Sequence, residues 1–227
     1  MKDAGVAFNR FRFDPAFQRG FEAGGRLLGQ ASMVLGGYDC PVSAAASQAT
    51  VVFDSPEEEE LSIAEWARMN GVWYANPKDF MISSGFRFYG FGGEAQVYSE
   101  SDSYVHKICR TGQYDSLSLF FDRIVIQNTI CPPAALLIEG FGRDEQDDFV
   151  VIMKQRFFRQ SYIMTEDEII DYMRRIGFRD IRDDRFGNVR FYSNQVVAED
   201  LHTGNIWMTA GSNVVIIDGA FRFNVNG

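Results

Sequence analysis

The chain has 227 residues, of which 46% are hydrophobic and 15% aromatic, so its composition excludes a generally disordered chain and predicts a packed core. Its 31 acidic and 22 basic residues give a net charge of -9, which excludes a nucleic-acid binder held by bulk positive charge. No run approaches the roughly 18 apolar residues that a membrane span needs, and the N-terminus contains no secretory signal core. We therefore expect a cytoplasmic protein whose partners are neither a membrane nor a nucleic acid.

The small number of cysteines and histidines restricts the chemistry that the chain can perform. Three scattered cysteines are too few for a disulfide framework or a structural zinc site, and two histidines argue against a histidine-built metal centre. Catalysis would therefore rest on carboxylates, amides, lysines and backbone groups.

The first part of the chain, residues 1–84, predicts helices. Asp14-Pro15 is a typical helix start, and we expect a helix from there toward Leu28. Ser55-Pro56 and the four glutamates that follow predict a second helix, because the serine side chain can cap free amides and acids favour the positive end of the helix dipole. This helix should end near Asn70-Gly71 and present one side with Leu61, Ala64, Ala67 and Arg68.

From residue 85 the pattern changes to short strands separated by turns. We expect strands at 85–89, 95–99, 104–109, 135–141 and 149–153, and a helix at 116–128 with apolar residues at helical spacing. Thr165 and Glu168 form a capping box that opens another helix, which should continue to about Ile176-Gly177. The stretch 178–195 is charged and loop-rich, with a turn at 183–188 between short strands, and a strand-loop-strand unit follows at 195–205 and 214–218.

A glycine-rich turn and a strand lysine form the first candidate site. Gly90, Gly92 and Gly93 lie between two predicted strands, where glycines let backbone amides approach a polyphosphate closely. Val97 on the next strand can cover a purine ring, and Lys107 lies one hairpin turn further along. Separately, a plain hairpin and a solvent-facing lysine explain these residues equally well.

Two carboxylates and an amide near the C-terminus form the second candidate site. Asp200 and Asn205 are separated by a short loop with apolar flanks, and Asp218 ends a strand of four apolar residues. A carboxylate can accept a proton from an attacking hydroxyl, and amide and carboxylate oxygens are suitable ligands for a hard cation. Each segment alone is consistent with a turn, but their order favours one functional unit.

Together these features resemble the protein-kinase-like superfamily: a glycine-rich loop, a lysine on the third strand, a D-x-x-x-x-N loop and the aspartate of a D-F-G-type element. The loop Asp200-Leu-His-Thr-Gly-Asn205 resembles those of small-molecule phosphotransferases and other atypical kinases more than those of typical protein kinases. The set as a whole is similar to an atypical, minimal kinase, the kinase-like domain of polyvalent proteins from phages and bacterial conjugative elements. The resemblance covers about residues 85–221.

The resemblance implies an α+β, two-lobed fold. Residues 1–84 would be a partly helical N-terminal extension, 85–156 an N-lobe with an antiparallel sheet, and 157–227 a reduced, mostly helical C-lobe carrying the catalytic and metal loops. It also implies an enzyme, a Mg-ATP-dependent kinase that transfers the γ-phosphoryl group to a hydroxyl, with protein Ser/Thr as the expected acceptor.

The resemblance also implies roles for the residues near the nucleotide. Gly90, Gly92 and Gly93 would cover the ATP phosphates, Val97 would contact the base, and Lys107 would hold the α- and β-phosphates.

In the second half of the site, Asp200 would be the catalytic base, and Asn205 and Asp218 would bind Mg²⁺. The backbone of the segment 153–156, with Met153 and Gln155, would contact adenine. Asp122 would take the place of the usual helix glutamate that pairs with the strand lysine, although its side chain is one methylene shorter.

Several departures from the pattern leave alternatives open. Ala198 and Glu199 replace the histidine and arginine that usually precede the catalytic aspartate, and Gly219 replaces the phenylalanine of D-F-G. Residues 219–227 leave no length for an activation segment, so we expect a minimal kinase, a truncated one, or one in which residues 1–84 supply the missing packing. The alternative functions are an inactive pseudokinase acting as an interaction module and a small-molecule kinase.

Overall fold

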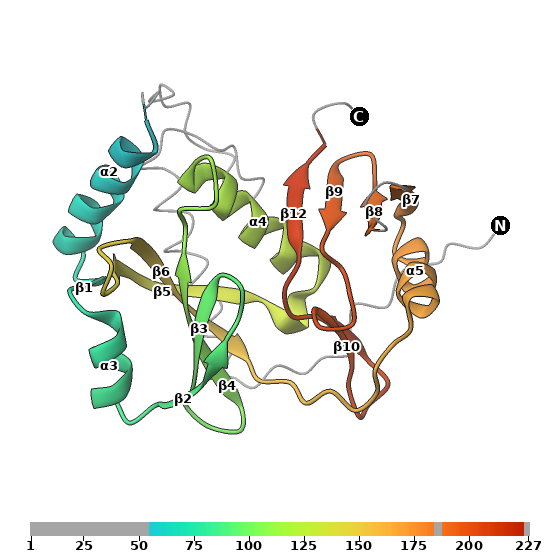
Figure 1. The fold of residues 1–227 in the computed structure, drawn as a ribbon, viewed down its shortest axis with the longest axis horizontal. Helices are drawn as coiled ribbons and strands as arrows, with labels where there is room; N and C mark the ends of the chain where they lie inside the picture. The colour runs from blue at the N-terminus through green and yellow to red at the C-terminus, as the bar shows by residue number, and fades with distance from the viewer. Residues whose placement is uncertain (1–54, 184–187, 225–227) are drawn as a thin grey trace.

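A computed structural model of the chain describes residues 55–183 and 188–224. It has a mixed α+β architecture in which α2 (Pro56–Met69) and α3 (Pro77–Ser83) accompany a six-stranded sheet, and α5 (Glu166–Arg175) accompanies a second group of strands. Figure 1 shows these two groups side by side, with α4 (Leu117–Ile130) running between them. The helix predicted at 14–28 lies outside the described residues.

The six-stranded sheet has the order β1-β5-β6-β4-β3-β2 and is antiparallel except where β1 pairs with β5. Its strands are β1 (Trp73–Tyr74), β2 (Arg87–Phe91), β3 (Ala95–Ser99), β4 (Tyr104–Arg110), β5 (Leu136–Arg143) and β6 (Phe149–Arg156). All five strands predicted in this region are confirmed, and β4, β5 and β6 extend further than their apolar runs indicated.

Apolar side chains cover both faces of this sheet. One cluster joins α2 and α4 to β5 and β6, with Ile63, Phe120, Phe141 and Val151 among its buried members. The other cluster places Met81 of α3 against Tyr98, Ile108, Val150 and Ile152. Because each fully buried side chain of this size stabilises the fold by about 1.5–3 kcal/mol, the helices of residues 56–83 are part of the core of this lobe.

Helix α2 begins as its sequence predicted. The Ser55 side chain accepts a hydrogen bond from the backbone N–H of Glu58, Pro56 occupies the first turn, and the helix is capped at Asn70. Its buried face is formed by Glu59, Ile63, Ala64 and Ala67. The prediction that Leu61 shares this face is wrong, since 57% of that residue is exposed: Leu61 lies about 200° around a 3.6-residue helix from Ile63.

The parallel pairing of β1 with β5 depends on glycine. Phe141 donates its N–H to the Val72 carbonyl at 2.9 Å, and a Cβ at Gly140 would lie 2.6 Å from that same carbonyl oxygen. A Cβ at Gly142 would meet the carbonyl oxygen of Tyr74 in the same way. Only residues without a side chain allow the two backbones to approach so closely. Strand β1 has two residues, which is too short to give a periodic signal in the sequence.

The second group of strands corrects the expectation of a mostly helical C-lobe. In the described residues beyond 156, α5 is the helix, and the strands are β7 (Arg179–Asp183), β8 (Asn188–Tyr192), β9 (Val196–Glu199), β10 (Ile206–Met208), β11 (Val214–Ile216) and β12 (Ala220–Phe223). They form a four-stranded sheet of order β12-β9-β8-β7 and the hairpin β10-β11. In β12, Phe221 is buried between the exposed Ala220 and Arg222, as expected of a strand whose successive side chains point to opposite faces.

Helix α5 begins at its predicted cap, and α4 begins at a serine cap where its apolar spacing predicted a helix. Thr165 and Glu168 form the expected capping box of α5, and the side chain of Ser116 accepts the Leu119 N–H of α4. After α4, a short 3-10 helix, η1 (Pro132–Ala134), leads into β5. Helix α4 packs on both groups of strands, so it connects the two halves of the molecule.

Glu59 supplies a second cap to α4 from α2. Its buried carboxylate accepts the Leu117 N–H at 2.6 Å and the Ser118 hydroxyl at 3.4 Å. A carboxylate at a helix N-terminus satisfies a free amide and interacts favourably with the helix dipole. Residues 56–84 therefore hold α4 in addition to packing against the sheet.

We expect Glu59→Ala to lower the free energy of unfolding by about 1–3 kcal/mol, because it leaves a buried helix-terminal N–H without its acceptor. Urea denaturation followed by circular dichroism measures this change. The exposed Glu65 of the same helix provides the control, and Glu65→Ala should change stability by less than about 0.5 kcal/mol. Equal effects of the two substitutions would contradict the capping role.

Candidate functional site

The four polar residues singled out in the sequence are linked by a continuous chain of contacts between the two halves of the molecule. The Lys107 ammonium, on β4, donates to the carbonyl of Ile217 at 3.2 Å. Ile217 and Asp218 in turn donate their backbone N–H groups to the Asn205 carbonyl, at 2.9 and 3.4 Å. Asn205 then contacts Asp200 through its side chain, so residues 110 positions apart in sequence meet at one place.

The loop between Asp200 and Asn205 is closed by its own side chains. The Asn205 amide nitrogen donates to the Asp200 carbonyl at 2.9 Å and to its carboxylate at 3.0 Å. Asp200 has a φ of 58°, a left-handed conformation that aspartate tolerates better than most residues. Because 63% of its side chain is exposed, the Asp200 carboxylate is accessible to a reactant.

The Ile217 carbonyl receives two further donors. The side-chain amides of Gln155, on β6, and Gln127, on α4, approach it at 3.1 and 3.4 Å. Both glutamines are almost fully buried, and sequence reasoning did not identify either side chain as part of the site. The residue that precedes Asp218 is thus held by three elements of the N-terminal half.

The face of the sheet that carries Lys107 also carries Val97 and Met153. Val97 pairs with Lys107 across β3 and β4, and Lys107 pairs with Met153 across β4 and β6. Directly opposed residues of neighbouring strands point to the same face, so these three side chains form a row. Val97 and Met153 are thereby positioned to contact the same ligand as Lys107.

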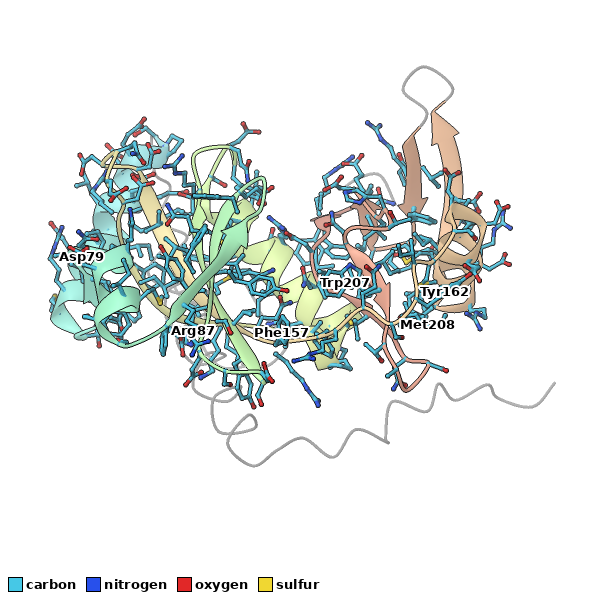
Figure 2. The ribbon with its side chains drawn as sticks, turned by 60° about the horizontal axis from the view of Figure 1, so that its bottom comes forward. Asp79, Arg87, Phe157, Tyr162, Trp207 and Met208 are labelled. Atoms are coloured by element: carbon cyan, nitrogen blue, oxygen red, sulfur yellow. The ribbon has the colours of Figure 1, made fainter. Side chains whose placement is uncertain are left out.

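The backbone of the segment 153–156, which was expected to contact adenine, is engaged in the sheet. These residues lie within β6, between β4 and β5, where the ladder hydrogen bonds of a central strand engage N–H and C=O groups on both sides. Gln155 contributes its side chain instead, donating to the Ala134 and Ile217 carbonyls. The chain leaves the sheet at Phe157, which Figure 2 shows where it crosses from one half of the molecule to the other.

The glycine-rich turn connects β2 to β3. Gly90 is within β2 opposite Val97, and the Gly92 N–H donates to the Ala95 carbonyl at 2.7 Å to close the turn. Among the described residues, a Cβ at Gly90 or Gly93 would meet no atom within 4 Å. Packing within this part of the chain therefore does not require glycine at these positions, whereas close approach of a ligand to the backbone would.

Arg123 of α4 is a member of the site that sequence reasoning missed. Its side chain, 9% exposed, forms ion pairs with Asp218 and with Glu94, the latter at 2.5 Å. Its Nε donates to the Gly219 carbonyl at 2.9 Å, and its guanidinium also contacts the Tyr114 hydroxyl. Arg123 therefore joins the turn before β3 to the segment that carries Asp218.

The charges around Arg123 reinforce one another. Burial disfavours its positive charge, but the negative charges of Asp218 and Glu94 outweigh burial, so the pKa of Arg123 is raised. Burial also raises the pKa of Tyr114, helped by Glu94, and the Tyr114 hydroxyl accordingly donates to the Glu94 carboxylate at 2.9 Å. The cluster is a cation between two carboxylates in a partly desolvated setting, where ionic contacts are strengthened.

Asp122, the predicted partner of Lys107, is adjacent to Arg123 and buried. Successive residues of an α-helix point about 100° apart, so the two charged side chains leave α4 in different directions. Arg123 points toward Asp218. The pairing of Asp122 with Lys107 stays a prediction.

Several cavities border the site, and the glycine-rich turn lines one of about 180 Å³ together with Ile108 and Val150. A small one of about 20 Å³ is lined by side chains of the cluster, including Glu94, Lys107, Arg123, Met153 and Asp218. Another of about 180 Å³ is lined by Glu166, Ile169, Val189, Phe191 and residues 200–203. Asp200 thus borders a recess large enough to receive part of a second molecule.

Asp218 and Asn205 carry side-chain oxygen atoms of the kind that Mg²⁺ prefers as ligands. Among the described residues there is no group of three or more His, Cys, Asp or Glu side chains that could hold a metal ion. Mg²⁺ commonly takes only one or two protein ligands when phosphates and water complete its shell. The donor set therefore suits a nucleotide-dependent ion better than a metal held by protein alone.

A family profile described as Serine/Threonine/Tyrosine Kinase found in polyvalent proteins matches residues 56–225. Since this match spans most of the chain, the chain belongs to that family, and the resemblance inferred from its motifs is confirmed. Membership supports a kinase-like phosphotransferase and implies that the protein binds a nucleotide. The match begins with α2, well before the glycine-rich turn.

No curated protein matches the chain. Within the described residues, none of the helices combines the length and apolarity that crossing a membrane requires.

Cys109, on the same strand as Lys107, provides a test of how tightly the cleft is packed. Burial raises the pKa of its thiol to about 12, so at pH 8 the thiol stays protonated and unreactive. We expect iodoacetamide at pH 8 to leave Cys109 unmodified in the native protein and to modify it rapidly in urea, as measured by peptide mass spectrometry. Equal rates in the two states would show that the cleft opens freely.

Proposed function

We propose that the chain is a phosphotransferase that moves the γ-phosphoryl group of Mg-ATP to a hydroxyl, with protein Ser/Thr side chains as the acceptor class. The observation that carries this proposal is the series of contacts joining Lys107, Asp218, Asn205 and Asp200. A phosphate-binding cation, two oxygen ligands and an accessible carboxylate are the groups that phosphoryl transfer requires.

Asp200 is the proposed catalytic base. Its carboxylate accepts the proton of the acceptor hydroxyl, while the Asn205 amide holds the loop in place through two hydrogen bonds. The cavity of about 180 Å³ beside Asp200 is the proposed entry for the acceptor. General-base assistance of this kind contributes about 10²–10⁴-fold to rate.

Lys107 and the glycine-rich turn are proposed to hold the nucleotide. The ammonium binds phosphate oxygens, and the turn formed by residues 90–93 lets backbone amides approach the phosphates. Val97 and Met153 contact the base, whose polar edge faces the chain after Arg156 because the strand before it is fully paired. Asp218 and Asn205 would hold Mg²⁺, which neutralises the charge that develops on the phosphates.

A binding-only kinase-like module is the second candidate function. It is favoured by the ion pair between Arg123 and Asp218, which engages a proposed metal ligand, and by the small volume of the cleft. The two candidates differ in turnover, and both require nucleotide binding to be measured separately from catalysis.

Asp200→Asn should reduce phosphoryl transfer by about 10²–10⁴-fold, because the amide keeps the shape of the side chain but cannot accept a proton at neutral pH. Transfer from γ-labelled ATP to protein substrates measures the loss. The exposed Asp171 on α5 provides the control, and Asp171→Asn should retain the wild-type rate. Equal signal from wild type and Asp200→Asn would contradict the catalytic assignment.

Mg-ATP at about ten times its Kd should stabilise the wild-type protein by about 1.4 kcal/mol, visible as a rise in Tm. For Asp218→Asn we expect the part of this rise that depends on Mg²⁺ to disappear, since a proposed ligand is lost. Each variant is compared with itself with and without nucleotide, so that changes in basal stability cancel. A wild type that millimolar Mg-ATP leaves unshifted would argue against both candidates.

A further inference from the structure

Glu94 directly follows the glycine pair of the turn, and its side chain points into the cleft. Its carboxylate accepts hydrogen bonds from Arg123 at 2.5 Å and from the Tyr114 hydroxyl at 2.9 Å. One third of the side chain is exposed, and it lines the same cavity as Lys107 and Asp218. An anionic group of the protein therefore lies in the cavity beside Lys107 and Asp218, where the proposed function puts the polyphosphate.

The guanidinium of Arg123 is shared between this carboxylate and the segment around Asp218. It contacts Glu94 and Asp218, while its Nε donates to the Gly219 carbonyl. A guanidinium presents several donors in one plane and matches phosphate oxygens as well as carboxylates. Because Arg123 is almost fully buried, a second anion that reaches it must take the place of one already bound.

We propose that Arg123 is a phosphate-binding residue and that Glu94 is its internal competitor, a carboxylate that the nucleotide polyphosphate displaces. This inference rests on the proposed function and adds two residues to it. Glu94 is the partner that leaves, because its backbone is held by a hydrogen bond from the Arg110 N–H at 3.0 Å, whereas Asp218 is anchored on both sides. The preceding Ile217 carbonyl accepts from Lys107, Gln127 and Gln155, and the following Gly219 carbonyl accepts from Arg123.

Charge explains why the exchange favours the nucleotide once it binds. Glu94 and Asp218 together balance Arg123 and Lys107, so adding a polyphosphate creates repulsion that moving Glu94 relieves. In the free protein, the fraction of molecules with Glu94 released limits the apparent affinity. The predicted consequence is a nucleotide affinity that Glu94 lowers and that its neutralisation raises.

The test measures nucleotide binding rather than activity. Isothermal titration with Mg-ATP, and separately with inorganic tripolyphosphate, gives Kd for wild type, Glu94→Gln, Arg123→Gln and the double variant. We expect Glu94→Gln to lower the Kd of both ligands by about tenfold, a typical effect of removing a competing charged hydrogen bond. We expect Arg123→Gln to raise the Kd of both. In the Arg123→Gln background the gain from Glu94→Gln should vanish.

Two further variants control for charge and folding. Glu145→Gln removes an exposed carboxylate of the β5–β6 turn that pairs with Lys78, and it should leave Kd unchanged. Glu94→Asp keeps the charge but shortens the side chain, and it should give a smaller gain than Glu94→Gln. Circular dichroism confirms the folded state of each variant, and Arg123→Lys replaces Arg123→Gln if the latter unfolds.

The outcomes separate this inference from the proposed function. If wild type binds Mg-ATP and Glu94→Gln binds it equally or more weakly, Glu94 is only a structural partner of Arg123. The proposal that Glu94 competes with the nucleotide is then overturned, while the proposed function stands. A gain that persists in the Arg123→Gln background would also overturn it, since Glu94 would then act only by general repulsion. If no variant binds nucleotide, the proposed function fails and this inference fails with it.

Discussion

The carbonyl oxygen of Ile217 is the contact on which the arrangement of the cleft depends. Lys107, Gln127 and Gln155 donate to it from three different elements of the N-terminal half. A carbonyl has two lone pairs, so three donors at 3.1–3.4 Å share it and none is optimal alone. In a buried setting their sum still fixes the peptide, and because Asp218 follows directly, the position of its carboxylate is set from the opposite half of the molecule.

Much of the N-terminal half was predictable because its signals are local. Apolar runs bounded by turn residues predicted β2 to β6, Ser55 and Thr165 predicted the starts of two helices, and apolar spacing predicted α4. The strands beyond residue 177 were harder, since each has three to five residues and is stabilised mainly by its partners. The local pattern still predicted short strands around the turn at 183–188, at 195–205 and at 214–218, whereas the kinase resemblance favoured a mostly helical lobe. The structure forms strands there, as the local pattern indicated.

The order of the motifs in the sequence led to the candidate residues of the strands and loops. It did not identify the residue of α4 that faces the cleft, because that depends on how the helix is oriented. Reasoning from the resemblance sought an acid on α4 and selected Asp122. Arg123 lies three residues after Phe120 and four before Gln127, which puts all three on one face of α4. The structure shows all three to be buried, but the polar Gln127 interrupts the apolar pattern that could have indicated this face. Glu94 gave no comparable signal, since an acid beside a glycine turn is usually a solvated one.

Helix α4 is held at both ends, and this restricts how the cleft can rearrange. At its start Glu59 caps the Leu117 N–H. Near its end the Asn128 amide exchanges two hydrogen bonds with the backbone of Leu136, at 2.7 and 2.9 Å. With both ends tied to neighbouring elements, the helix cannot shift without breaking buried hydrogen bonds, each of which costs about 1–3 kcal/mol to leave unmade. Arg123 is therefore a fixed cation. The turn that carries Glu94 is itself closed by backbone hydrogen bonds, from the Gly92 N–H to the Ala95 carbonyl and from the Arg110 N–H to the Glu94 carbonyl, so an exchange of the anions around Arg123 has to come from movement of the Glu94 side chain.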